Sequence, residues 1–153
     1  MTDKEDGPNS ISAGQKVQPV VLLIGDSPDY PRIFELLASK LQIRFKVVRG
    51  CAEGLRALDE ARFDIVVMDW QMPEIDGRIC TGKIREREKT SGKRTPVIGI
   101  TGHVKATLDN CLSAGMDDYL AMPFTYDQLH QKLTFWLSSD YGCDGDGDGD
   151  GKR

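Results

Sequence analysis

Short apolar runs alternate with segments of helical periodicity through the middle of the chain. The runs predict strands at Val20–Ile24, Arg44–Val48, Ile65–Met68, Pro96–Ile100 and Tyr119–Ala121. Between and after these runs, apolar side chains recur at helical spacing, as at Ile33, Leu36, Leu37 and Leu41 and again at Leu129, Leu133, Trp136 and Leu137. Strand–helix units in a row predict an α/β fold, with a parallel sheet covered by helices on both faces.

The topology of such a sheet is limited by the right-handed crossover of each strand–helix–strand unit. We therefore expect a flavodoxin-like three-layer fold, with a five-stranded parallel sheet of order 2-1-3-4-5 and five helices. In this order the first and third strands are neighbours, and their carboxyl ends lie at the same edge. Asp26 follows the first strand and Asp69 follows the third, so these side chains should meet in one cleft.

The two ends of the chain differ from the middle in composition. Residues 1–18 are polar and predict a disordered lead, whereas residues 139–153 predict a flexible acidic tail with an Asp-Gly repeat. The start of this repeat superficially resembles a calcium loop. It lacks the terminal bidentate glutamate of such loops, so a flexible tail is the favoured interpretation. Residues 19–138 are left as the folded domain.

The overall composition mainly excludes some classes of partner and some cellular locations. A net charge of −4 over 153 residues gives no electrostatic basis for binding nucleic acid or an anionic membrane. No apolar run reaches the roughly 18 residues of a membrane span, and the N-terminus lacks the pattern of a signal peptide. We therefore expect a cytoplasmic protein whose partners include neither nucleic acid nor a membrane.

The four cysteines give no sign of a structural zinc site. They are widely separated, at Cys51, Cys80, Cys111 and Cys143, and no CxxC pair is present. In a reducing compartment we expect them to be ordinary thiols. The chain has only 2 histidines, which also argues against a histidine-rich metal site.

The candidate chemistry lies at the predicted strand ends. The apolar run Ile65–Met68 delivers a carboxylate, Asp69, where open parallel sheets bind ligands. Spacing alone leaves open whether Asp69 is a functional group or an acidic turn residue. Two carboxylates crowded into one cleft repel each other unless a cation lies between them. Their hard oxygen ligands favour Mg²⁺.

The segment from Asp64 to Gly77, which includes Asp-Trp-Gln-Met-Pro, closely resembles the phosphoacceptor region of two-component receiver domains. Such domains occur in response regulators and hybrid histidine kinases, and the resemblance extends over about residues 19–137. It implies that Asp69 accepts a phosphoryl group from a histidine kinase or a histidine phosphotransfer protein. It also implies that Asp69, Asp26 and the backbone carbonyl of Gln71 bind Mg²⁺.

The same resemblance assigns roles to residues at the fourth and fifth strands. Thr101 matches the hydroxyl that hydrogen-bonds the phosphoryl group. Tyr119 matches the aromatic switch residue, whose rotamer follows the movement of Thr101, and the switch changes a face that binds a downstream protein. Met122-Pro123 matches a position where the family often has a cis peptide bond, although the sequence by itself supports only a rigid turn.

Two positions depart from the family pattern. Receivers usually carry an acidic pair after the first strand and a lysine before the proline that follows the fifth; this chain has Gly25 and Met122 there. Loss of one charge-assisted contact costs about 1.5–3 kcal/mol. Because one carboxylate and one ammonium are missing together, the net charge of the cleft is unchanged. We therefore expect the cleft to fold and to bind Mg²⁺ more weakly.

Each site residue also has a purely structural explanation. Asp26 could cap the first helix, Thr101 could be an ordinary strand-end residue, and Tyr119 could be a core aromatic residue. At the level of the whole chain, a working receiver is the favoured function. The alternative is an atypical receiver that binds its partner without phosphorylation. The sequence leaves open whether the chain is a stand-alone protein or a piece of a hybrid kinase.

Two enzyme classes are disfavoured. The acidic, proline-containing segment after the first strand lacks the Gly/Ser/Thr-rich loop of backbone donors that a phosphate-bearing cofactor requires. Gln71 occupies the position where aspartate-nucleophile phosphatases have a second aspartate. We therefore expect that the protein is not an enzyme. At most it would phosphorylate itself from small donors and dephosphorylate itself.

Overall fold

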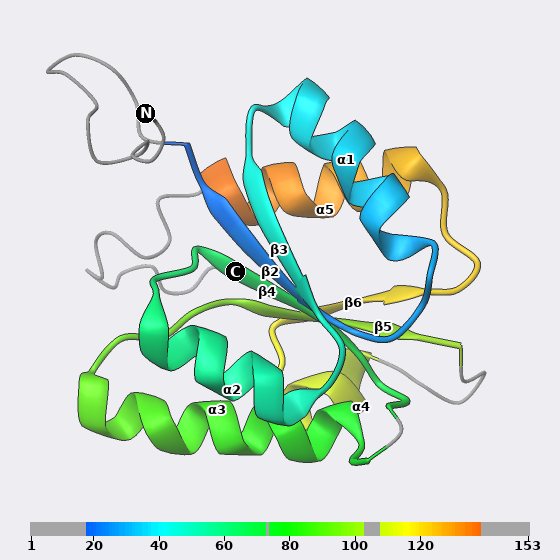
Figure 1. Cartoon of the computed structure of the whole chain (residues 1–153). Helices are drawn as coiled ribbons and strands as arrows, with labels where there is room; N and C mark the ends of the chain where they lie inside the picture. The colour runs from blue at the N-terminus through cyan, green and yellow to red at the C-terminus, as the bar shows by residue number, and fades with distance from the viewer. Residues whose placement is uncertain (1–17, 73, 103–107, 139–153) are drawn as a thin grey trace, which may run out of the picture.

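The computed structural model describes residues 18–72, 74–102 and 108–138. Strands and helices alternate along these residues (Figure 1). The strands are β2 (Val20–Ile24), β3 (Arg44–Val48), β4 (Ile65–Asp69), β5 (Val97–Thr101) and β6 (Asp118–Ala121). The helices are α1 (Tyr30–Leu41), α2 (Cys51–Glu60), α3 (Gly77–Ser91), α4 (Leu108–Ser113) and α5 (Tyr126–Ser138).

The strands form a single parallel sheet in the order β3-β2-β4-β5-β6, which confirms the predicted topology. Boundaries differ from the sequence prediction by a residue at three strands. Asp69 belongs to β4, and β6 begins at Asp118. β5 begins at Val97 because Pro96 has no N–H to donate, although its carbonyl still accepts a hydrogen bond from Val66.

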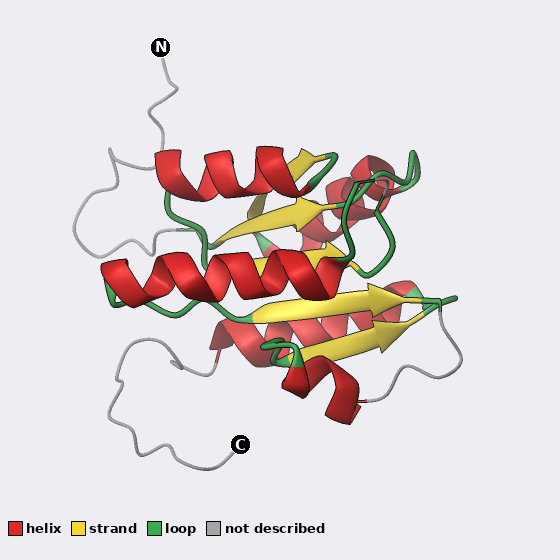
Figure 2. Ribbon diagram, turned by 90° about the horizontal axis from the view of Figure 1, so that it is seen from below, coloured by secondary structure: helices red, strands yellow, loops and turns green. Residues whose placement is uncertain are grey.

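Helices cover both faces of the sheet, as Figures 1 and 2 show. Side chains of β2 and β4 alternate between two apolar clusters because successive residues of a strand point to opposite faces. One cluster lies beneath α1 and α5 and includes Val21, Leu23, Ile65 and Val67. The other lies beneath α2, α3 and α4 and includes Leu22, Ile24, Val66 and Met68. A strand buried on both faces needs an unbroken apolar run, which is the pattern that the sequence shows.

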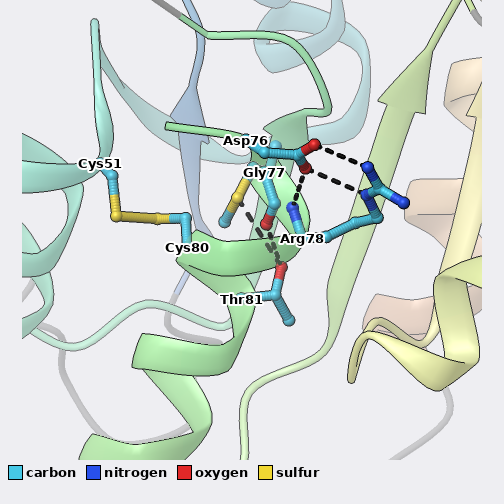
Figure 3. Close-up of a disulfide and its surroundings, with 7 residues drawn as sticks. Cys51, Asp76, Gly77, Arg78, Cys80 and Thr81 are labelled. Atoms are coloured by element: carbon cyan, nitrogen blue, oxygen red, sulfur yellow. Dashed lines mark hydrogen bonds and ion pairs between the residues drawn. A yellow bond between two sulfur atoms is a disulfide. The ribbon is translucent and has the colours of Figure 1, made fainter. Parts of the chain in front are cut away.

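The connection from β4 to α3 is held by a helix cap and a glycine. The side chain of Asp76, the N-cap of α3, accepts a hydrogen bond of 2.7 Å from the backbone N–H of Arg78 (Figure 3). The backbone N–H of Gly77 donates to the carbonyl of Trp70 at 2.7 Å. A Cβ atom at residue 77 would overlap the carbonyl oxygen of Asp69. Only glycine therefore allows α3 to begin so close to the end of β4.

The structure corrects the expectation that all cysteines are ordinary thiols. Cys51, the first residue of α2, forms a disulfide with Cys80 in the first turns of α3, with their Cα atoms 5.8 Å apart (Figure 3). The two residues are 29 positions apart in the sequence, and packing of α2 against α3 brings them together. Cys111 remains a free, buried thiol, and burial raises its pKa to about 11. Cys143 lies outside the described residues.

Other sequence predictions also fall outside the described residues. These include the acidic tail at 139–153 with its calcium-loop alternative, and the lead at 1–18 except for Gln18. Among the helices that the structure describes, none has the length and apolar character needed to cross a membrane.

Reduction of the disulfide should lower the free energy of unfolding by about 3–4 kcal/mol, because the bond closes a loop of 29 residues in the unfolded chain. Urea unfolding with and without dithiothreitol measures this difference. The double variant Cys51→Ser/Cys80→Ser is the control, and dithiothreitol should leave its unfolding curve unchanged. Coincident curves for the oxidised and reduced wild-type protein would contradict the expectation.

Substitution of Gly77 by alanine should destabilise the protein by about 1–3 kcal/mol, because the added methyl group overpacks against the backbone of Asp69. Gly82→Ala on the same helix is the matched control, since a Cβ there meets nothing within 4 Å. Alanine favours a helix interior, so Gly82→Ala should be stabilising by about 0.5–1 kcal/mol. Similar unfolding midpoints for the two variants would show that the β4–α3 turn tolerates a side chain.

Candidate functional site

The predicted site residues gather at the carboxyl edge of the sheet. Asp69 ends β4 and Thr101 ends β5, while Gly25 and Asp26 directly follow β2. Parallel pairing aligns Ile24 with Met68, so the segments that follow β2 and β4 are neighbours. The expectation that Asp26 and Asp69 meet is consistent with this register, and the backbone of Asp26 hydrogen-bonds the Asp69 side chain.

The Asp69 carboxylate is half-buried and accepts a strong hydrogen bond. The hydroxyl of Tyr30, the first residue of α1, donates to Oδ1 of Asp69 at 2.5 Å. Burial raises the pKa of the Asp69 carboxyl above its ordinary value. The hydrogen bonds from Tyr30 and the Asp26 backbone act against that rise, and the negative charge of Asp26 adds to it.

Tyr30 remains a neutral donor. Burial raises the pKa of its hydroxyl far above the ordinary value, and the hydrogen bond to Asp69 and the charge of that carboxylate raise it further. The side chain is only 2% exposed. The hydroxyl therefore carries its proton at neutral pH and presents it to Oδ1 of Asp69.

Asp26 occupies a different environment from Asp69. Its side chain is 46% exposed, and its Oδ1 lies 3.5 Å from Nε of Arg49. Arg49 is 79% exposed, so this ion pair is weak and can exchange for another cation. The N-cap of α1 is Asp29, three residues further on, which excludes the alternative that Asp26 caps this helix.

A surface cavity of about 470 Å³ lies beside Asp26. Its lining consists mainly of residues from the start of α2, with opposite charges interspersed: Asp26, Arg49, Gly50, Ala52, Glu53, Arg56 and Glu74. Asp69 and Thr101 are not part of this lining, so the cavity flanks the two carboxylates on the α2 side. It offers solvent access to Asp26.

Residues at the ends of β5 and β6 complete the edge. Thr101 is 2% exposed, and its carbonyl accepts a hydrogen bond of 2.8 Å from the backbone N–H of Met122. The Met122–Pro123 peptide bond is cis, and the Met122 side chain is 46% exposed. Tyr119 on β6 is half-buried and packs against the cluster beneath α2, α3 and α4. Its half-buried position is compatible with both the switch role and the core role.

The donor set fits a divalent cation with few protein ligands. Asp69 and Asp26 supply carboxylate oxygens, and Gln71 lies exposed two residues after Asp69. Within the described ranges no group of three or more His, Cys, Asp or Glu side chains could enclose a metal ion. Two neighbouring carboxylates, with water in the remaining positions, match the coordination that Mg²⁺ prefers. Transition metals with nitrogen or sulfur ligands do not fit this set.

Sequence reasoning missed three residues that shape the site. Tyr30 contacts Asp69 from 39 positions away, and Arg49 pairs with Asp26 from the end of β3. Gly77 holds the turn beneath Asp69. The Asp-Gly pair at 76–77 was a visible turn signal, but no sequence signal joins Tyr30 or Arg49 to the acidic residues. These contacts depend on how α1 and β3 pack beside β4.

Comparison with known proteins supports the geometry. A family model described as response regulator receiver domain matches residues 21–134. The sensor protein GacS of Pseudomonas syringae pv. syringae is 33% identical over 120 residues, which cover 77% of this chain and 13% of GacS. The chain therefore spans a small part of this curated relative.

Two solved structures are similar over most of the chain. The receiver domain of sensor histidine kinase PA1611 from Pseudomonas aeruginosa PAO1, which has a magnesium ion coordinated in its active site cleft, is 32% identical. The match has a TM-score of 0.69 and covers 80% of this chain and 99% of that one. The Saccharomyces cerevisiae receiver domain of Ssk1, co-crystallised with the histidine phosphotransfer protein Ypd1, gives a TM-score of 0.70 at 25% identity and covers 82% and 90%. The chain belongs to the response regulator receiver domain family of two-component phosphorelays.

Proposed function

We propose that Asp69 of this receiver domain accepts a phosphoryl group from a histidine kinase or a histidine phosphotransfer protein, in a reaction that uses Mg²⁺. The observation that carries the proposal is the position of Asp69 at the end of β4, next to the segment that holds Asp26. A carboxylate at this edge is accessible to a donor from the loops that follow the strands.

The proposed transfer is a direct in-line displacement. One oxygen of Asp69 attacks phosphorus, the P–N bond of a phosphohistidine breaks, and an aspartyl phosphate forms. The leaving imidazole keeps the electron pair and takes up a proton. When bound to Asp69, Asp26 and the carbonyl of Gln71, Mg²⁺ would neutralise charge on the phosphoryl oxygens. The hydroxyl of Thr101, at the end of β5, would donate a hydrogen bond to one of these oxygens.

The family's switch role is proposed for Thr101 and Tyr119. The two residues lie on adjacent paired strands, with Gly99 aligned to Tyr119 and Thr101 aligned to Ala121. A shift of the Thr101 hydroxyl toward a phosphoryl group would open space at the carboxyl end of β5. Tyr119 is half-buried, which leaves its ring room to change rotamer in response.

A histidine phosphotransfer protein is the partner that the comparisons favour, since the similar Ssk1 receiver was crystallised with Ypd1. A downstream protein target, the absence of nucleic-acid and membrane partners, and a cytoplasmic location stay predictions from the composition and net charge. We also take residues 19–138 as the receiver unit, which the family match at 21–134 supports. The lead at 1–18 and the tail at 139–153 stay predictions.

A phosphorylation-independent interaction module is the second candidate. Gly25 and Met122 remove one carboxylate and one ammonium from the family pattern, and Tyr30 already engages one oxygen of Asp69. These features would weaken the interactions that stabilise a phosphoryl group on Asp69, while the receiver fold is kept. In either case the chain would turn over no outside substrate, apart from self-phosphorylation by small donors and slow loss of the phosphoryl group to water.

Incubation with acetyl phosphate or phosphoramidate and Mg²⁺ should add one phosphoryl group to the wild-type protein, as read by intact mass. Asp69→Asn should show no adduct, because an amide oxygen is a poor nucleophile. Asp59→Asn is the matched control, since Asp59 is an exposed carboxylate near the far end of α2 and should leave the adduct intact. An adduct that persists in Asp69→Asn would refute Asp69 as the acceptor. No adduct with any donor would favour the interaction module.

Binding of Mg²⁺ should be weakened roughly tenfold or more by Asp26→Asn, because attraction between neighbouring unit charges at a protein surface is worth several kcal/mol. Trp70 is buried directly after Asp69, and its fluorescence should report the titration. A Trp136→Phe background removes the chain's other tryptophan signal. Equal Mg²⁺ affinities with and without the Asp26 carboxylate would remove this residue from the proposed metal site.

A further inference from the structure

The space beside Asp69 that an acidic residue at position 25 would need is already filled. A Cβ atom placed on Gly25 would lie 2.7 Å from Cε2 of Tyr30 and 2.8 Å from Oδ2 of Asp69. Both distances are shorter than carbon and oxygen atoms tolerate without displacement. The ring of Tyr30 therefore stands where the first member of the family's acidic pair would begin, and glycine at position 25 makes room for it.

Tyr30 cannot easily move out of this position. Its side chain is 2% exposed and belongs to the cluster beneath α1 and α5, together with Val21, Leu23 and Phe34. Its backbone N–H donates to the carbonyl of Ser27 at 3.3 Å, and a proline follows at the start of the helix. The hydroxyl is consequently held at Oδ1 of Asp69 by packing as well as by its own hydrogen bond.

The Tyr30 hydroxyl gives Asp69 a side-chain donor, in addition to the backbone hydrogen bond that Asp69 receives from Asp26. Met122 has no polar hydrogen in its side chain, and Arg49 pairs with Asp26. A hydrogen bond to a carboxylate withdraws charge from it and occupies a lone-pair direction. A divalent cation attracts the same charge, so the two interactions compete.

From these contacts we infer that Tyr30 is a positioning residue that replaces the missing acidic side chain: its ring fills the vacated volume, and its hydroxyl holds Asp69 through Oδ1 in competition with a divalent cation. The inference rests on the proposed role of Asp69 in the cleft. Tyr30 keeps Oδ2 of Asp69 facing Gly25 and lowers the affinity of the carboxylate for a metal ion.

Tyr30→Phe tests the hydroxyl alone, because the ring and its packing are kept. Its affinity for Mn²⁺, measured from the electron paramagnetic resonance signal of the free ion, should be about tenfold higher than that of the wild-type protein, the size of effect expected for one charge-assisted hydrogen bond. Tyr126→Phe is the matched control. Its hydroxyl is buried in α5, has no hydrogen-bond partner in the described part of the chain, and should leave Mn²⁺ affinity unchanged.

The comparison separates a positioning role from a merely structural one. A structural role would lower the urea midpoint of Tyr30→Phe and leave its Mn²⁺ affinity at the wild-type value. Equal or weaker Mn²⁺ affinity in Tyr30→Phe, or no binding by either protein, overturns the inference. The experiment needs no phosphoryl donor. Failure of Asp69 to gain a phosphoryl group would therefore refute the proposed function and leave the Mn²⁺ result to decide the role of Tyr30.

The shared volume is tested separately with uncharged substitutions. Gly25→Ala should raise the unfolding equilibrium constant at least tenfold when Tyr30 is present, because the methyl group meets the ring and the carboxylate. In a Tyr30→Leu background, where the side chain is smaller and flexible, the same change should cost clearly less. Additive effects of the two substitutions in urea unfolding would show that residues 25 and 30 do not compete for space.

Discussion

The pairing of β2 with β4 is the constraint on which the rest of the site depends. These strands are not consecutive in the chain, and their parallel register places Ile24 beside Met68. The carboxyl ends of the two strands thereby lie at one edge of the sheet. Asp69 ends β4 there, and Gly25 and Asp26 follow β2. The pairing is stable because β2 and β4 are almost wholly buried between two apolar clusters, so a slip in register would expose the side chains of one face.

Charge balance is the second determinant of this edge. Two carboxylates meet there, and the structure compensates them with different partners: an exposed arginine for Asp26 and a buried tyrosine hydroxyl for Asp69. The ion pair is exposed and therefore weak, whereas the tyrosine is buried and fixed by packing. A receiver fold has thus accommodated glycine at position 25 and methionine at position 122, and both carboxylates have partners among the described residues.

The elements around the site are joined rigidly. Gly77 lets α3 start directly against the backbone of Asp69, and the Cys51–Cys80 disulfide ties that helix to the start of α2. The cavity beside Asp26 is lined largely by the same stretch of α2. On this side, the approach to the two carboxylates is therefore formed by the first turns of α2 and α3, which the disulfide joins.

Most of the architecture was determined by the sequence alone. Unbroken apolar runs and helical periodicity predicted the alternating elements and the strand order, because burial on both faces permits few other patterns. The resemblance carried by the segment from Asp64 to Gly77 predicted the family. Tertiary structure alone decided that Tyr30 holds Asp69 and that Cys51 meets Cys80. Contacts between residues 39 and 29 positions apart depend on helix packing, which local periodicity does not encode.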